Sequence, residues 1–190
     1  MDSNENTIRM KKLPEDFEIN KYGLHCRLVT EDDAAFIINL RSDNKRSRFI
    51  HETDDNIDHQ KTWIKEYKRR ESKGKEYYLI YDIDGIPFGV NRIYDVHDTY
   101  CTEGSWVCLP IEDSSKTIAS ALIIRDLIFE YFGFEYDLFN VSVGNNKVKK
   151  FHKISGATII DETLEEYTFK LTKEDYLANR EWFLNTYKLI

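Results

Sequence analysis

The most informative segment of the sequence is Asp137-Leu-Phe-Asn-Val-Ser-Val-Gly-Asn-Asn-Lys-Val-Lys-Lys-Phe-His-Lys-Ile-Ser-Gly-Ala157. Its apolar run predicts a short strand over 138–143, which Gly144 ends. Asn145 is expected to open a short helix, because asparagine caps helix N-termini well. Gly156 is expected to close it, because glycine adopts the left-handed conformation at low cost. The segment therefore predicts a strand that leads directly into a short helix.

Length and composition fit one folded domain. The chain has 190 residues, of which 41% are hydrophobic and 14% aromatic, and this content argues against disorder. No apolar run approaches the roughly 20 residues of a membrane span, and the first residues lack the pattern of a secretory signal. The three cysteines have no metal-ligand spacing, so we expect reduced thiols, no bound metal and a cytoplasmic location. The net charge of −7 disfavours nucleic acid as a partner.

The remaining elements follow from periodicity and from turn residues. Strands are predicted at 24–29, 77–81, 88–94, 102–109, 158–160 and 167–171. Helices are predicted to start at Thr30 and to cover 56–72, 116–132 and 173–187. Residues 1–22 are polar and are expected to form an arm, and 23–190 a single domain. One strand–helix–strand crossover among antiparallel strands predicts the α/β (α+β) class with a mixed, mostly antiparallel sheet.

The pattern Asn145, Val148, Phe151, His152, Gly156 resembles the end of the cofactor half of GNAT acyl-CoA N-acetyltransferases. In that family a tyrosine usually stands where this chain has His152. The predicted element order also resembles the GNAT fold from about residue 24 to 171, with the last helix lying outside the usual core. The resemblance implies splayed central strands flanked by helices, and acetyl-CoA as co-substrate.

The resemblance implies eight cofactor-binding positions: Val107, Leu109, Lys116, Thr117, Ile118, Ala119, Asn145 and Lys147. The backbone of the strand that contains Val107 would pair with pantetheine, and the start of the helix after it would bind the diphosphate. The helix start departs from the family motif, because both motif glycines are absent and Lys116 replaces Arg or Gln. Asn145 has a second interpretation as a plain helix cap, and Lys147 as a solvated surface charge.

Two residues are predicted to move protons. His152 stands at the family's acid position, and an imidazolium near its usual pKa of about 6.5 can protonate the departing thiolate. The alternative is a structural histidine packed on its helix. Glu103, on a strand that would face the substrate, is predicted to assist loss of the amine proton, and the alternative is an exposed strand carboxylate.

Four segments of the sequence, 40–50, 59–63, 89–94 and 103–106, resemble amino-sugar N-acetyltransferases of bacterial surface-polysaccharide pathways. The acceptor implied is a nucleotide-linked amino sugar, and its predicted contacts are Arg41, Arg48, Arg92 and Tyr94. Two other interpretations stay open: an N-terminal acetyltransferase of the ribosomal-protein type, and a non-catalytic GNAT-fold binding module. The aromatic residues of the last helix, Trp182, Phe183 and Tyr187, suit either inward packing or a homodimer.

Overall fold

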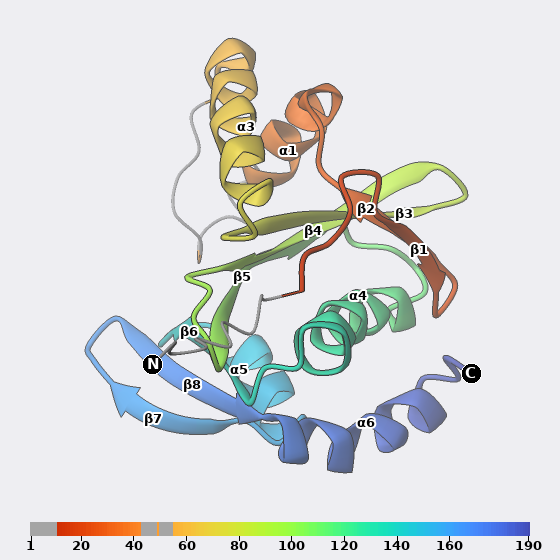
Figure 1. Cartoon of the computed structure of the whole chain (residues 1–190). Helices are drawn as coiled ribbons and strands as arrows, with labels where there is room; N and C mark the ends of the chain where they lie inside the picture. The colour runs from red at the N-terminus through yellow and green to blue at the C-terminus, as the bar shows by residue number, and fades with distance from the viewer. Residues whose placement is uncertain (1–10, 43–48, 50–54) are drawn as a thin grey trace, which may run out of the picture.

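An eight-stranded sheet runs through the residues that the computed structural model describes, 11–42, 49 and 55–190 (Figure 1). Its strand order is β1-β2-β3-β4-β5-β6-β8-β7. The strands are β1 (Glu18–Lys21), β2 (Leu24–Leu28), β3 (Tyr77–Ile83), β4 (Ile86–Tyr94), β5 (Tyr100–Cys108), β6 (Tyr136–Ser142), β7 (Thr158–Glu162) and β8 (Glu166–Thr172). The α/β class with a mixed, mostly antiparallel sheet is confirmed.

Helices cover both faces of this sheet (Figure 1). They are η1 (Glu31–Asp33), α1 (Ala34–Ser42), α3 (Ile57–Glu71), α4 (Ser115–Asp126), its π-helical continuation η2 (Leu127–Phe132), α5 (Asn146–Ile154) and α6 (Lys173–Thr186). The strand β3 is buried on both sides: Tyr77 and Leu79 pack in the core with α4, whereas Tyr78 and Ile80 pack in the core with α1 and α3.

The strands β5 and β6 form the parallel pair, and α4 lies in the crossover between them. Their pairing covers three positions, from Tyr100 opposite Tyr136 to Thr102 opposite Leu138. Beyond Thr102 the two strands continue without pairing to each other, so the sheet splays at its centre. The splay expected from the family resemblance is therefore present.

The segment quoted above folds as predicted. The strand β6 leads into α5, and the Asn145 side chain caps that helix by accepting a hydrogen bond from the Val148 amide at 3.3 Å. Gly156 follows the helix with φ of +95°, a conformation that glycine tolerates best. A substituted side chain at Gly156 would also lie 3.1 Å from Asp175 Cβ, which adds a packing reason for glycine.

The N-terminal region differs from the expected arm. Glu18–Lys21 pairs antiparallel with β2 as an edge strand, and Leu13 is buried in the core. Residues 1–10 lie outside the described part of the chain. An edge strand pairs on one side alone and often carries polar side chains. In sequence such a strand looks like a polar arm.

The last helix packs mainly inward. Phe183 is buried, whereas the Trp182 side chain is about half exposed. Tyr176 anchors α6 to α4, because its hydroxyl donates to Asp126 Oδ1 at 2.6 Å. Within the described ranges, no helix is long and apolar enough to cross a membrane.

Candidate active site

Two adjoining cavities open where β5 and β6 separate. The first, which we call the helix-side chamber, has a volume of about 490 Å³ and lies between the end of β5, the start of α4 and α5. The second, the sheet-side chamber, has a volume of about 400 Å³ and lies between β5, β6 and α5. Both are lined by Trp106, Cys108, Lys147 and Val148. The strand splay, the crossover helix and α5 therefore surround two adjoining chambers, which together we call the cleft.

Six of the eight predicted cofactor positions line this cleft. Leu109, Thr117 and Ile118 line the helix-side chamber, Val107 and Asn145 line the sheet-side chamber, and Lys147 lines both. Lys116 and Ala119 do not.

The two exceptions have a common geometric cause. Lys116 and Ala119 are three residues apart and share one face of α4. Lys116 extends to the turn at Gly23, and Ala119 is fully buried in the core. That face of the helix turns away from the cleft.

A bulge in β5 shapes the sheet-side chamber. Its register against β4 changes between Val107, which lies opposite Val90, and Gly104, which lies opposite Arg92. Ser105 takes up the extra residue with φ of +55°. The Trp106 indole turns to the α4 side, where its Nε1–H donates to Ser120 Oγ at 3.0 Å.

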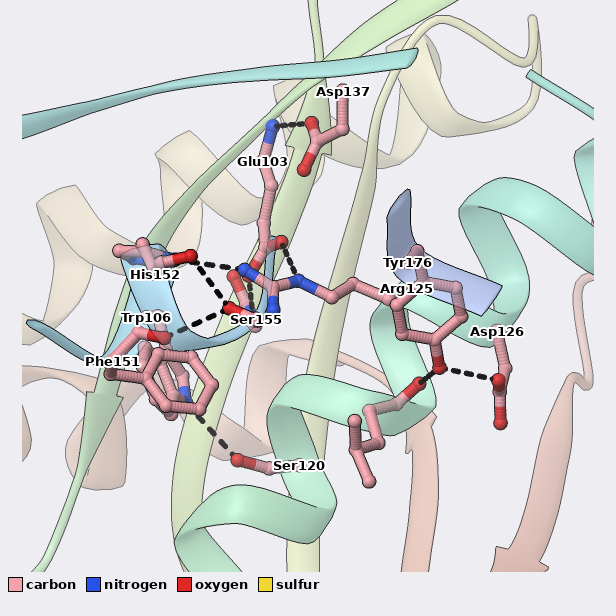
Figure 2. Close-up of polar contacts among 12 residues, drawn as sticks. Glu103, Trp106, Ser120, Arg125, Asp126, Asp137, Phe151, His152, Ser155 and Tyr176 are labelled. Atoms are coloured by element: carbon pink, nitrogen blue, oxygen red, sulfur yellow. Dashed lines mark hydrogen bonds and ion pairs between the residues drawn. The ribbon is translucent and has the colours of Figure 1, made fainter. Parts of the chain in front are cut away.

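A chain of buried polar side chains borders the sheet-side chamber (Figure 2). The Glu103 carboxylate accepts from Asn91 Nδ2 at 3.0 Å and pairs with Arg125 Nε at 3.4 Å. Arg125, which has no exposed surface, also contacts His152 Nδ1 through Nη2 at 2.8 Å. On the other side, Asp137 Oδ1 accepts from the Glu103 backbone amide at 2.9 Å. The two predicted catalytic residues are thus brought together by Arg125.

His152 is held as a neutral imidazole. A guanidinium only donates hydrogen bonds, so Nδ1 must be the acceptor and the ring proton must reside on Nε2. Burial, followed by the charge of Arg125, lowers the pKa of His152 well below its usual range. The imidazolium donor expected from the sequence is therefore disfavoured, because a neutral ring donates hydrogen bonds but is a poor acid.

Asp137 is the opposite case. Burial raises the pKa of this fully enclosed carboxyl well above its usual range, and the negative charge of Glu103 adds to the effect. Its neutral form leaves one carboxylate, Glu103, to balance one guanidinium, Arg125. The buried chain is then uncharged as a whole, which limits the cost of enclosing it.

A carboxylate lies just before the start of α4. Asp113 Oδ1 accepts from the Ser115 amide at 3.0 Å. A hydrogen bond from the Ser115 side chain, followed by the one from this amide, lowers the pKa of Asp113. A negative charge therefore lies at the helix N-terminus, where the resemblance implied a diphosphate.

Of the four predicted acceptor contacts, the three that the structure describes, Arg41, Arg92 and Tyr94, do not line the cleft. Arg92 pairs with Glu76, and its guanidinium lies over the Trp63 ring at 5.0 Å and the Tyr94 ring at 5.1 Å. The Tyr94 ring covers the face of Gly104, where an added Cβ would lie 2.7 Å from the hydroxyl.

Arg41 lies in the last turn of α1, near the Tyr78 hydroxyl, where its charge opposes the effect of burial on the pKa of that tyrosine. Arg48 lies outside the described residues. Tyr94 packs on Gly104, which lines the sheet-side chamber.

Sequence reasoning missed Arg125, Asp137 and Trp106 as site residues. A signal for Arg125 exists, because Arg125 and Asp126 interrupt an otherwise apolar helical run, and both are buried. Within the described ranges, no group of three or more potential ligands is arranged to hold a metal ion.

Comparison with known proteins identifies the family. No protein-family model and no curated protein sequence matches the chain. Among solved structures, it is similar to apo FdhC, described as a nucleotide-linked sugar GNAT, with 34% identity and a TM-score of 0.80 over 88% of this chain and 97% of that one.

Two more distant structures share the fold. The ribosomal-protein-S5-alanine acetyltransferase from Vibrio fischeri has 11% identity and a TM-score of 0.69, over 85% of this chain and 99% of that one. Mutant forms of the spermidine/spermine N-acetyltransferase SpeG from Vibrio cholerae have 16% identity and a TM-score of 0.64, over 83% and 98%. From the splayed sheet, the cleft and the similarity to FdhC, the chain belongs to the GNAT family of acetyltransferases.

Proposed function

We propose that the protein transfers an acetyl group from acetyl-CoA to the primary amine of a nucleotide-linked amino sugar. The observation that carries this proposal is the 34% identity to a nucleotide-linked sugar GNAT along 97% of that chain. The more distant acetyltransferases, which include enzymes named for a ribosomal protein and for spermidine, share the fold at 11% and 16% identity. They therefore do not favour a different acceptor.

The cleft suits acetyl-CoA as the donor. Pantetheine is an extended chain with amide groups, and the part of β5 beyond Thr102 has backbone groups that do not pair with β6. In the proposed complex, Val107 and Leu109 border the donor chain, and Ile118 and Phe151 supply apolar walls. The Leu109 amide already donates to the Phe88 carbonyl at 2.6 Å, so it does not pair with pantetheine. Lys147 offers a positive charge to a phosphate of the donor.

The reaction proceeds by direct attack of the amine on the thioester. Glu103 takes the proton that the amine loses, directly or through a water molecule. We assign this role to Glu103 because it alone carries a carboxylate among the described residues that line the two chambers. A carbon–nitrogen bond forms and the carbon–sulfur bond breaks. Backbone amides of the bulged strand polarise the thioester carbonyl. His152 donates its Nε2–H to the departing thiolate as a hydrogen bond, and the amine's proton reaches the thiolate through solvent.

One observation favours a second candidate. The glycine-free start of α4, with the Asp113 carboxylate beside it, suits a GNAT-fold binding module that no longer holds CoA. Calorimetry separates the two functions: the proposed enzyme binds acetyl-CoA, and absence of binding at millimolar ligand identifies the module.

The acceptor is tested by assaying CoA release with nucleotide-linked amino sugars, spermidine and peptides with free N-termini. Activity with at least one nucleotide-linked amino sugar, well above that with the other two classes, is expected. Activity confined to peptides identifies an N-terminal acetyltransferase instead.

A further inference from the structure

We propose that Arg125 is a positioning residue for the transfer reaction: it fixes the ring tautomer of His152 and couples that ring to Glu103. This inference deepens the proposed function and rests on it. The role is distinct from contact with substrate, because Arg125 has no exposed surface and is absent from the lining of either chamber.

The tautomer follows from one contact. Arg125 Nη2 lies 2.8 Å from His152 Nδ1, and the guanidinium has no lone pair to accept a hydrogen bond. The ring proton must therefore sit on Nε2, the nitrogen that Arg125 leaves free. Among the described residues Nε2 has no hydrogen-bond partner, and His152 lines the sheet-side chamber. The donor that this tautomer creates is available to a molecule in the cleft.

Aromatic packing holds this pair in place. The Arg125 guanidinium lies 5.3 Å from the Phe151 ring centre and 5.7 Å from that of Phe139. The Phe139 ring lies 4.2 Å from the imidazole, and the Phe169 ring 5.7 Å from it, on the strands β6 and β8. Rotation of the imidazole would leave a buried guanidinium without its acceptor, which is costly.

The same guanidinium links the two ends of the reaction. Arg125 Nε lies 3.4 Å from Glu103, so one planar group contacts both the carboxylate and the imidazole. When Glu103 takes the amine's proton, its charge no longer offsets that of Arg125. The positive charge then acts more strongly on His152, and its Nε2–H becomes a better donor just as the thiolate forms. Asp137, kept neutral by burial beside Glu103, adds no second negative charge to weaken this effect.

The test is nitrogen-15 NMR of histidine-labelled protein without substrate, at several pH values from 6 to 8. The five histidines are distinguished by loss of one signal set in His152→Asn. In the wild type we expect an unprotonated Nδ1 and a protonated Nε2 at His152 throughout this range. A proton on Nδ1, or titration of His152 with a midpoint near 6.5, would overturn the proposal.

Two variants separate positioning from the charge of Glu103. Glu103→Gln keeps Arg125 and is expected to keep the wild-type tautomer. Glu103→Gln/Arg125→Met removes both charges together, and we expect its His152 Nδ1 signal to move and its ring to titrate closer to 6.5. The double variant should also have a kcat lower than Glu103→Gln by about tenfold, with an unchanged KM for acetyl-CoA.

Spectra of the double variant that match those of the wild type would refute the positioning role, as would equal kcat values for the two variants. The NMR result does not depend on activity. A protein with the expected tautomer but no transfer to any amine would retain the Arg125–His152 contact and refute the proposed function alone.

Discussion

Replacing His152 by asparagine tests how the thiolate is stabilised. The asparagine carbonyl can still accept from Arg125 on the Nδ1 side, so the buried guanidinium keeps a partner, but the Nε2–H donor is lost. A hydrogen bond to a charged group contributes about 1.5–3 kcal/mol, which corresponds to roughly a 10- to 150-fold decrease in kcat. The KM for acetyl-CoA should change little, because the lost bond forms as the thiolate departs.

The assay is CoA release measured with a thiol reagent from pH 5.5 to 8.5, for the wild type and for His152→Asn. We expect kcat of the wild type to show no decline with rising pH between 6 and 8, because the pKa of His152 lies well below its usual value and the ring is neutral throughout. The two profiles should be parallel. A tenfold loss of wild-type kcat per pH unit above about 6.5, absent from the variant, would mean that an imidazolium protonates the thiolate and would refute this reasoning.

Three further predictions concern stability and donor binding. Glu103→Gln leaves the buried Arg125 charge without its partner, so urea unfolding should give a free energy of unfolding about 3–5 kcal/mol below that of the wild type. The loss should be smaller in Glu103→Gln/Arg125→Met, and a loss under about 1 kcal/mol in the single variant would contradict the ion pair. The pKa of His152 is lower in the folded protein, so as pH falls the unfolded chain binds a proton at this residue that the folded protein does not. The free energy of unfolding should therefore drop more from pH 7 to 5 in the wild type than in His152→Asn. An equal drop in both would argue against a buried neutral ring. Asp113→Asn keeps an oxygen that can accept from the Ser115 amide but removes a negative charge, so calorimetry should show acetyl-CoA binding up to about fivefold tighter. An unchanged affinity would place the diphosphate elsewhere.

Local patterns predicted most of the fold. The strand–helix segment at 137–157 and the long helix at 116–132 carry their signals in neighbouring residues, through apolar periodicity and through caps such as Asn145 and Gly133. The edge strand β1 escaped prediction because its stability comes from pairing with β2, and its polar side chains give no apolar signal.

The candidate site could be predicted only in part, because its residues are joined by contacts between distant parts of the chain. Glu103 and His152 stand at positions that a family pattern marks, but their connection through Arg125 spans 22 residues to one partner and 27 to the other. Tertiary contacts of this kind have no local signature. The same holds for Arg92, which was predicted to contact the acceptor and is instead paired with Glu76, 16 residues away.

Acetyl transfer to a nucleotide-linked amino sugar is tested directly by a mass-spectrometric assay with acetyl-CoA and a panel of nucleotide-linked amino sugars, with spermidine and free peptides as competing acceptors. We expect a nucleotide-linked product that carries one added acetyl group and one equivalent of free CoA, both diminished in His152→Asn. Transfer to spermidine or peptides with none to any nucleotide-linked amino sugar would contradict this expectation.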